Sequence, residues 1–141
     1  MIHDDLKLTG ALTIALNDEI VQETENLVVT AGKNWVASRM KDTTQDAMSH
    51  MAVGTGTTVA AAGNTTLVTE NDRNALTSTT VTGNAIAYVA TWAAGDGTAA
   101  LTEAGIFDAA SAGDMLCRTV FSVVNKGAAD SMTITWTITV S

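Results

Sequence analysis

Two histidines and one cysteine are the side chains of this 141-residue sequence best suited to metal binding or nucleophilic chemistry. A zinc site needs several Cys, His or carboxylate ligands at workable spacing, and neither His3 nor His50 belongs to such a set. His50 stands inside a strand-like pattern, which is typical of a packed or surface histidine. Cys117 lies in the apolar segment 115–124, so we expect a buried, unreactive thiol, and a lone cysteine forms no intrachain disulfide.

Acidic and glycine-rich segments suggest two other kinds of site, for a cation and for a phosphate. The acidic residues near the start lack the alternating ligand spacing of a calcium loop, which favours a solvated acidic face. Residues 54–56 (Gly-Thr-Gly) and 95–97 (Gly-Asp-Gly) lack the third glycine of a dinucleotide-binding turn and the Lys-Ser/Thr of a P-loop. The sequence therefore predicts no catalytic residue, no cofactor and no metal ligand. The acidic residues are Asp4, Asp5, Asp18, Glu19, Glu23 and Glu25.

The net charge of −8 opposes binding to nucleic acid or to anionic lipid, since both need a basic face. The same charge favours solubility and suits docking on a basic protein surface. No run of about 18 apolar residues predicts a membrane span, and residues 1–5 lack the basic start and apolar stretch of a signal peptide. We therefore expect the chain to be made in a cytoplasm and kept there until it joins a partner.

The elements that position these residues are mostly strands, and the clearest is at the C-terminus. Its apolar residues alternate with threonines, a period-2 pattern that predicts a strand with one apolar face and one hydroxyl face. We expect this strand to be paired inside a sheet and Trp136 to lie in the core. The alternating apolar residues are Met132, Ile134, Trp136, Ile138 and Val140.

The rest of the chain repeats this pattern in short segments separated by turn residues. Seven or eight such strands predict an all-β fold, an antiparallel β-sandwich or jelly roll with one short helix. We expect a single domain over residues 1–141, with residues 1–5 as an N-terminal arm. The expected elements are strands at 6–16 (bent or bulged at Gly10), 20–29, 48–53, 73–82, 85–92, 100–109 and 115–124. They also include a helix at 31–41 capped by Thr30, a helical turn at 67–72 and a type II′ turn at Gly83-Asn84.

One segment, residues 54–66, is a long loop of small residues without periodicity. Loops of this length in compact domains are often functional. We therefore expect this loop and the N-terminal arm to contact a partner, together with a tryptophan that ends its strand. The candidate interface residues are Met1, Ile2, His3, Asp4, Thr55, Thr57, Thr58, Val59 and Trp92.

Several segments resemble small virion proteins of tailed bacteriophages. The most distinctive are Leu-Thr-Glu-Ala-Gly-Ile-Phe-Asp at 101–108 and Met-Leu-Cys-Arg-Thr-Val-Phe at 115–121, followed by the alternating strand at 132–138. Residues 51–58 and 61–65 are similar to the same group, so the resemblance covers about residues 48–141. It implies a structural role and supplies no catalytic residue.

The resemblance leaves two roles open, a capsid cement (decoration) protein and a tail fibre base or tail adaptor. We expect a non-enzymatic cement protein in the virion, a homotrimer bound to the major capsid protein on the outside of the shell. The absence of a long coiled coil or receptor-binding segment favours cement over tail. A carbohydrate-binding module is a third hypothesis, but it would need exposed, clustered aromatic residues, and these are scarce.

Overall fold

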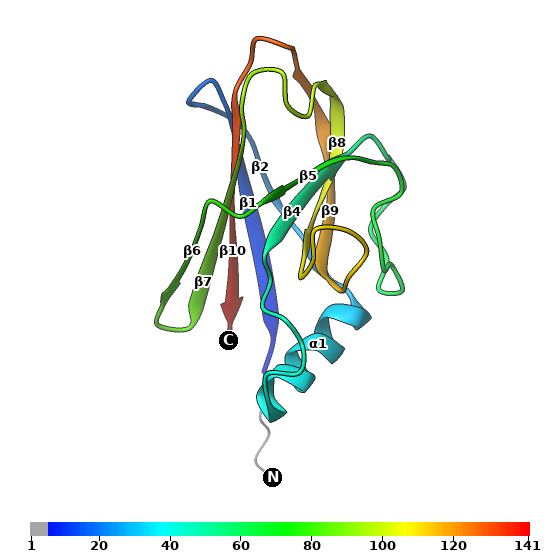
Figure 1. Cartoon of the computed structure of the whole chain (residues 1–141), viewed down its shortest axis with the longest axis vertical. Coiled ribbons are helices and arrows are strands. Elements are labelled where there is room, and N and C mark those ends of the chain that lie inside the picture. The colour runs from blue at the N-terminus through cyan, green and yellow to red at the C-terminus, as the bar shows by residue number, and fades with distance from the viewer. Residues whose placement is uncertain (1–5) are drawn as a thin grey trace.

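Two five-stranded antiparallel sheets lie face to face in the computed structural model, which describes residues 6–141 (Figure 1). The first sheet has the order β2-β1-β10-β7-β6 and the second the order β3-β9-β8-β4-β5, with the apolar core between them. The predicted all-β sandwich with one short helix is confirmed. The elements are β1 (Leu8–Leu16), β2 (Glu19–Glu25), β3 (Leu27–Val28), α1 (Thr30–Lys41), β4 (His50–Gly54), β5 (Glu70–Ala75), β6 (Ser78–Thr82), β7 (Ala85–Trp92), β8 (Ala99–Phe107), β9 (Met115–Lys126) and β10 (Met132–Val140).

The C-terminal strand β10 lies at the centre of the first sheet, between β1 and β7, so the predicted pairing is confirmed. Its inward side chains are buried, including Ile134 and Trp136, while its threonines lie on the outer face. Pairing on both sides gives its backbone groups hydrogen-bond partners. This pairing explains why the strand stays regular almost to the end of the chain.

Two tight turns join neighbouring strands of the first sheet, and the second forms at the residues that the sequence predicts. Asn17 and Asp18 join β1 to β2 with φ values of 51° and 67°, in the left-handed region that Asn and Asp tolerate. Gly83 (φ 59°) joins β6 to β7 together with Asn84, whose φ is not positive. This combination is the predicted type II′ turn, whose twist matches that of the flanking strands.

The predicted continuous strand at 20–29 is wrong, because the chain changes sheets at Asn26. β2 ends at Glu25 in the first sheet, and β3 begins at Leu27 in the second. The Oδ1 atom of Asn26 accepts a hydrogen bond of 2.8 Å from Nε1 of Trp136. This contact with β10 holds the crossing point in place.

The predicted bend or bulge at Gly10 is also wrong. Gly10 pairs regularly with Ile138, and the irregularity in β1 falls between Ile14 and Ala15, opposite β2. Gly10 serves to leave space: a methyl group there would overlap Oδ1 of Asn26 and approach Cδ1 of Ile138 to 2.6 Å. The glycine therefore makes room for the side chain at the sheet crossing.

The helix α1 lies at one end of the sandwich, as a cover over that end (Figure 1). Thr30 is its first residue and not its cap, because Val29 occupies the cap position and no side chain caps the helix. The backbone N–H of Thr30 instead donates to the carbonyl oxygen of Ala62 at 2.8 Å. The loop after β4 therefore satisfies one of the helix N–H groups that have no partner within the helix.

Only part of α1 contacts the core. Trp35 and Val36 pack against the core, but Met40 is 81% exposed because the last helical turn lies beyond the sheets (Figure 1). The buried residue of the helix is Gly32, which lies against the backbone carbonyl of Leu116 in β9. A glycine at this position lets the helix approach the strand closely.

Replacing Gly32 with alanine is expected to destabilise the protein by about 1–3 kcal/mol, the usual cost of overpacking. Alanine normally favours a helix over glycine by about 1 kcal/mol, but here the new methyl group would overlap the Leu116 carbonyl. Urea unfolding measures the difference. Gly63→Ala is the control, since the space around Gly63 is open; equal stability of the two variants would contradict the close approach.

The segment between β4 and β7 differs from the prediction in two ways. The expected helical turn at 67–72 is wrong, because residues 68 and 69 form a bend and β5 begins at Glu70. The expected strand at 73–82 is divided into β5 and β6, which belong to different sheets. The chain therefore crosses from the second sheet to the first between Ala75 and Ser78.

Candidate functional site

A long loop between β4 and β5, residues 55–69, lies over the outer face of the second sheet (Figure 1), and we call it the strap loop. Its one buried apolar residue is Leu67, which packs with Phe107 and Met115 in a small cluster separate from the main core. The predicted loop at 54–66 is thus confirmed and extends slightly further. Two charged side chains of the second sheet hold the rest of it.

Glu103, on β8, is the first of these anchors and is fully buried. Its Oε2 accepts backbone N–H groups of Gly56 at 2.7 Å and Thr69 at 2.8 Å, and its Oε1 accepts that of Val68 at 2.9 Å. The carboxylate therefore joins the two ends of the strap loop. A side chain on Gly56 would displace it, since a Cβ there would overlap Oε2.

Arg118, on β9, is the second anchor and is also fully buried. Its Nη2 lies 3.0 Å from Oε1 of Glu103, and its Nε donates to the same oxygen at 3.1 Å. The guanidinium also reaches the middle of the strap loop, through Nη2 to the carbonyl oxygen of Thr58 (2.9 Å) and through Nη1 to Oδ1 of Asn64 (3.1 Å). One ion pair therefore fixes the loop at both ends and at its centre.

The electrostatics of Glu103 agree with this role. Burial raises its pKa, but hydrogen bonds from the backbone of Thr69, Val68 and Gly56 and from the Arg118 guanidinium outweigh burial, so the pKa lies below its usual value. A carboxylate with several donors is favoured in its charged form. Glu103 is therefore a structural anion.

Part of the strap loop remains accessible, and we call its residues 57–59 the tip. Thr55, Thr57, Thr58 and Val59 are exposed, and Val59 is 79% exposed. Four of the predicted interface residues thus share one surface segment that is tied down from beneath. Their role as an interface remains a prediction.

The other predicted interface residues are placed differently. Trp92 is fully buried in the core between the sheets, so its side chain is not available to a partner, and this prediction is wrong. Its position at the end of β7 suggested exposure, but the strand end is covered by the loop after it, where Gly97 lies against the Trp92 ring. Met1, Ile2, His3 and Asp4 lie outside the described residues.

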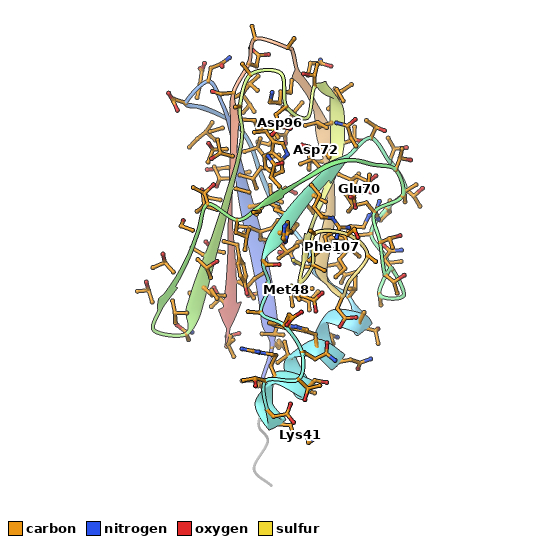
Figure 2. All side chains as sticks on the ribbon, viewed as in Figure 1. Lys41, Met48, Glu70, Asp72, Asp96 and Phe107 are labelled. Atoms are coloured by element: carbon orange, nitrogen blue, oxygen red, sulfur yellow. The ribbon has the colours of Figure 1, made fainter. Side chains whose placement is uncertain are left out.

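A second clamp lies beside the strap loop, around Arg73 of β5. Its guanidinium pairs with the Glu70 carboxylate at 2.7 Å and stacks 3.7 Å above the ring centroid of Phe107. Figure 2 shows Glu70 and Phe107 on the same side of the molecule. Arg73 also donates to the carbonyl oxygens of Ala109 and Ala112, so it ties the edge strand to the β8–β9 turn.

Asp72 and Asp96 form a polar cluster towards the end of the sandwich opposite α1 (Figure 2). Burial, a hydrogen bond with Asp96 and the charge of Asp96 raise the pKa of Asp72, while hydrogen bonds from Asn74 and Asp72 lower the pKa of Asp96. Asp72 therefore keeps its proton to a higher pH than Asp96 does. The nearby Lys126 is buried, and its Nζ donates to the carbonyl oxygen of Ala93 at 3.0 Å.

The residues first considered for chemistry are dispersed. Cys117 is fully buried, and burial raises its pKa, so the predicted buried thiol is confirmed. His50 is half-buried on β4 with its Nδ1 2.8 Å from Oγ of Ser49. Among residues 6–141, no three His, Cys, Asp or Glu side chains are grouped so as to hold a metal ion.

Sequence reasoning missed the roles of Glu103 and Arg118. The sequence did carry a signal for them. The apolar segment 101–107 contains one acidic residue, Glu103, and the next apolar segment, 115–121, contains one basic residue, Arg118. Charged residues are rarely buried unless they are paired. Such a pair on adjacent predicted strands could therefore have been proposed as a buried ion pair.

No protein-family model, curated protein or solved structure matches this chain. Within the described residues, no helix is long and apolar enough to cross a bilayer.

Proposed function

We propose that this chain is a non-enzymatic virion protein of a tailed bacteriophage, a cement protein that binds the outside of the major capsid shell and stabilises it. The observation that carries the proposal is the structure of the strap loop. Its tip, formed by Thr57, Thr58 and Val59, is exposed, while the fully buried Glu103–Arg118 ion pair holds the loop from beneath. The tip offers hydroxyl and methyl groups, which suit contact with a protein surface. The resemblance of residues 48–141 to small phage virion proteins supports the same role.

Rigid support of the tip favours binding, because ordering a mobile loop costs conformational entropy when a complex forms. The strap loop is ordered in advance by six hydrogen bonds to the Glu103–Arg118 pair and to Thr102. Five of them join the pair to residues 56, 58, 64, 68 and 69, and the sixth joins Oγ1 of Thr102 to the carbonyl oxygen of Gly56. A buried ion pair is costly to build, and here it stabilises a surface segment.

The charge and the outer face of the first sheet agree with a structural role. A net charge of −8 suits docking on a basic protein surface. The outer face of β10 and its neighbours carries mainly threonine side chains, with Oγ1 of Thr91 and Thr133 3.3 Å apart. The proposed homotrimer would need such exposed, uncharged faces for contact between copies.

The carbohydrate-binding alternative has less support, because the aromatic side chains are not exposed. All six aromatic residues lie in the described part of the chain, and five of them are buried. The sixth, Trp35, is half-buried against the core. A sugar platform needs accessible rings, so the strap loop is the better candidate for a binding surface. The buried residues are Tyr88, Trp92, Phe107, Phe121 and Trp136.

Counting copies in purified virions tests the location of the protein. Quantitative mass spectrometry should find several hundred copies per particle if the chain is a cement protein, because such proteins follow the capsid lattice. A handful of copies per particle would move the proposal to the alternative role of tail fibre base or tail adaptor. Absence of the chain from virions would overturn both.

Replacing Val59 with aspartate is expected to weaken binding to capsid shells about tenfold or more. The reason is that losing a side chain at the centre of an interface typically costs more than about 1 kcal/mol of binding free energy. The measurement is co-sedimentation of the purified protein with shells that lack it. The matched control is Val123→Asp, because Val123 is also exposed but belongs to β9 and not to the strap loop. Equal binding of both variants would show that the tip does not contact the shell.

A further inference from the structure

The four edge strands of the two sheets differ in how they are protected against pairing with another chain. In the first sheet, β2 carries Glu19, Glu23 and Glu25. In the second sheet, β3 has only two residues, and β5 carries charged side chains. Short edges and charged edge residues are the usual devices that prevent edge-to-edge association. The fourth edge, β6, has none of these devices.

β6 (Ser78–Thr82) has the sequence Ser-Thr-Thr-Val-Thr, with no charge, and all five residues are exposed. It pairs in regular register with β7 on one side and forms the edge of the first sheet on the other. The outward backbone N–H and C=O groups of an edge strand are a template for another strand. Because no bulge interrupts β6, that template is regular along its length.

The inner face of β6 is uncovered as well. Val81 pairs with Ile86, whose neighbours on the same face of β7, Tyr88 and Ala90, are buried in the core. Val81 itself is 69% exposed, because the β6–β7 hairpin splays away from the second sheet (Figure 1). An apolar side chain on the core-facing side therefore lies beside an unpaired strand edge.

The charge distribution indicates what could cover this edge. The segment 74–95, which contains β6 and β7, has no Asp, Glu, Lys or Arg, although the whole chain carries a net charge of −8. Two copies of an acidic protein repel each other, and the repulsion is weakest when uncharged surfaces meet, because no like charges are then brought close together. The neutral edge is thus suited to a second copy of the same chain.

We propose that β6 is a self-association edge, at which two copies pair antiparallel about a two-fold axis through Thr80 and join their first sheets into one. In this register Ser78 lies opposite Thr82 of the partner subunit, and Val81 lies opposite Thr79 of the partner subunit. Such an isologous contact closes on itself. It covers both copies of Val81 and the free backbone groups of both edges. The inference does not depend on the proposed capsid partner. Its two-fold contact at the β6 edge is separate from the three-fold contact of the proposed homotrimer, which the outer face of the first sheet would supply.

A cysteine placed on the two-fold axis tests the register. With Thr80→Cys, directly opposed residues have Cα atoms about 4.5–5.5 Å apart, within the range of a disulfide. Oxidised glutathione should convert this variant to a covalent dimer on a non-reducing gel. Cys117 is buried, so the parent chain serves as the blank. Thr82→Cys is the matched control: its two copies would be about 13 Å apart and should not cross-link.

A second pair of variants tests whether two copies associate through the β6 edge or through the outer face of the first sheet. Thr80→Lys places a charge at the centre of the edge and should raise the dissociation constant of the dimer at least tenfold in analytical ultracentrifugation. Thr135→Lys makes the same change at an exposed site on the central strand β10 and should leave it unchanged. The proposal is overturned if the parent chain stays monomeric up to about 1 mM, if only Thr135→Lys dissociates the dimer, or if Thr82→Cys cross-links as well as Thr80→Cys.

Discussion

Replacing Arg118 with methionine is expected to lower the free energy of unfolding by about 3–5 kcal/mol, the usual cost of removing one partner of a buried ion pair. The substitution leaves the fully buried Glu103 carboxylate without its countercharge. It also removes the hydrogen bonds to Thr58 and Asn64, so the centre of the strap loop loses its attachment. The effect should therefore combine global destabilisation with local loosening.

Urea unfolding measures the global part, and hydrogen exchange of the strap-loop amides measures the local part. Lys41→Met is the control, because Lys41 forms an exposed pair with Asp42 and such pairs contribute about 0–1 kcal/mol. Figure 2 shows Lys41 at the end of the molecule, away from the two sheets. If both variants lost the same small amount of stability, the Glu103–Arg118 pair would not be the anchor of the strap loop.

A double variant, Glu103→Leu with Arg118→Met, distinguishes the ion pair from the loop that it holds. Replacing a buried pair by apolar residues is often neutral. Here Glu103 also accepts three backbone N–H groups of the strap loop, which the double variant leaves without that acceptor. We therefore expect the double variant to stay well below the parent in stability. Full recovery would mean that the strap loop is not held by the carboxylate.

Replacing Trp136 with alanine is expected to cost about 3–5 kcal/mol, as for other large aromatic residues of a core. The ring is fully buried between the sheets, on the central strand β10. The variant also removes the Nε1 donor to Asn26, whose side chain marks the crossing between β2 and β3. Loss of the ring should therefore weaken both the core and the connection between the sheets.

Thermal and urea unfolding of this variant should be compared with those of Trp35→Ala. Trp35 is half-buried on α1, so a smaller loss is expected there. A cost below about 1 kcal/mol for Trp136→Ala would contradict its place in the core. A comparable loss for both variants would mean that the helix contributes as much to stability as the centre of the first sheet.

Much of the fold could be predicted because strand signals are local. The alternation from Met132 to Val140 depends only on the two-residue period of an extended chain, and it identified both the strand and the buried Trp136. The turn at Gly83-Asn84 depends on the backbone freedom of one glycine. The burial of Cys117 followed from the apolar segment around it.

Other features required contacts between residues far apart in the sequence. The break at Asn26 depends on a hydrogen bond to Trp136, and the space for it depends on Gly10. The burial of Trp92 depends on the loop that covers the strand end. No periodicity in a single segment carries this information, so the expected strand at 20–29, the expected bulge and the expected interface tryptophan were wrong.

Composition and short-range periodicity were enough to predict an all-β sandwich, a C-terminal strand paired inside a sheet, an acidic charge and a long loop. The contact between Glu103 and Arg118, their hold on the strap loop and the unprotected edge at β6 became visible only in the folded chain. Pairing register and strand order bring these groups together, and both depend on the packing of the whole chain.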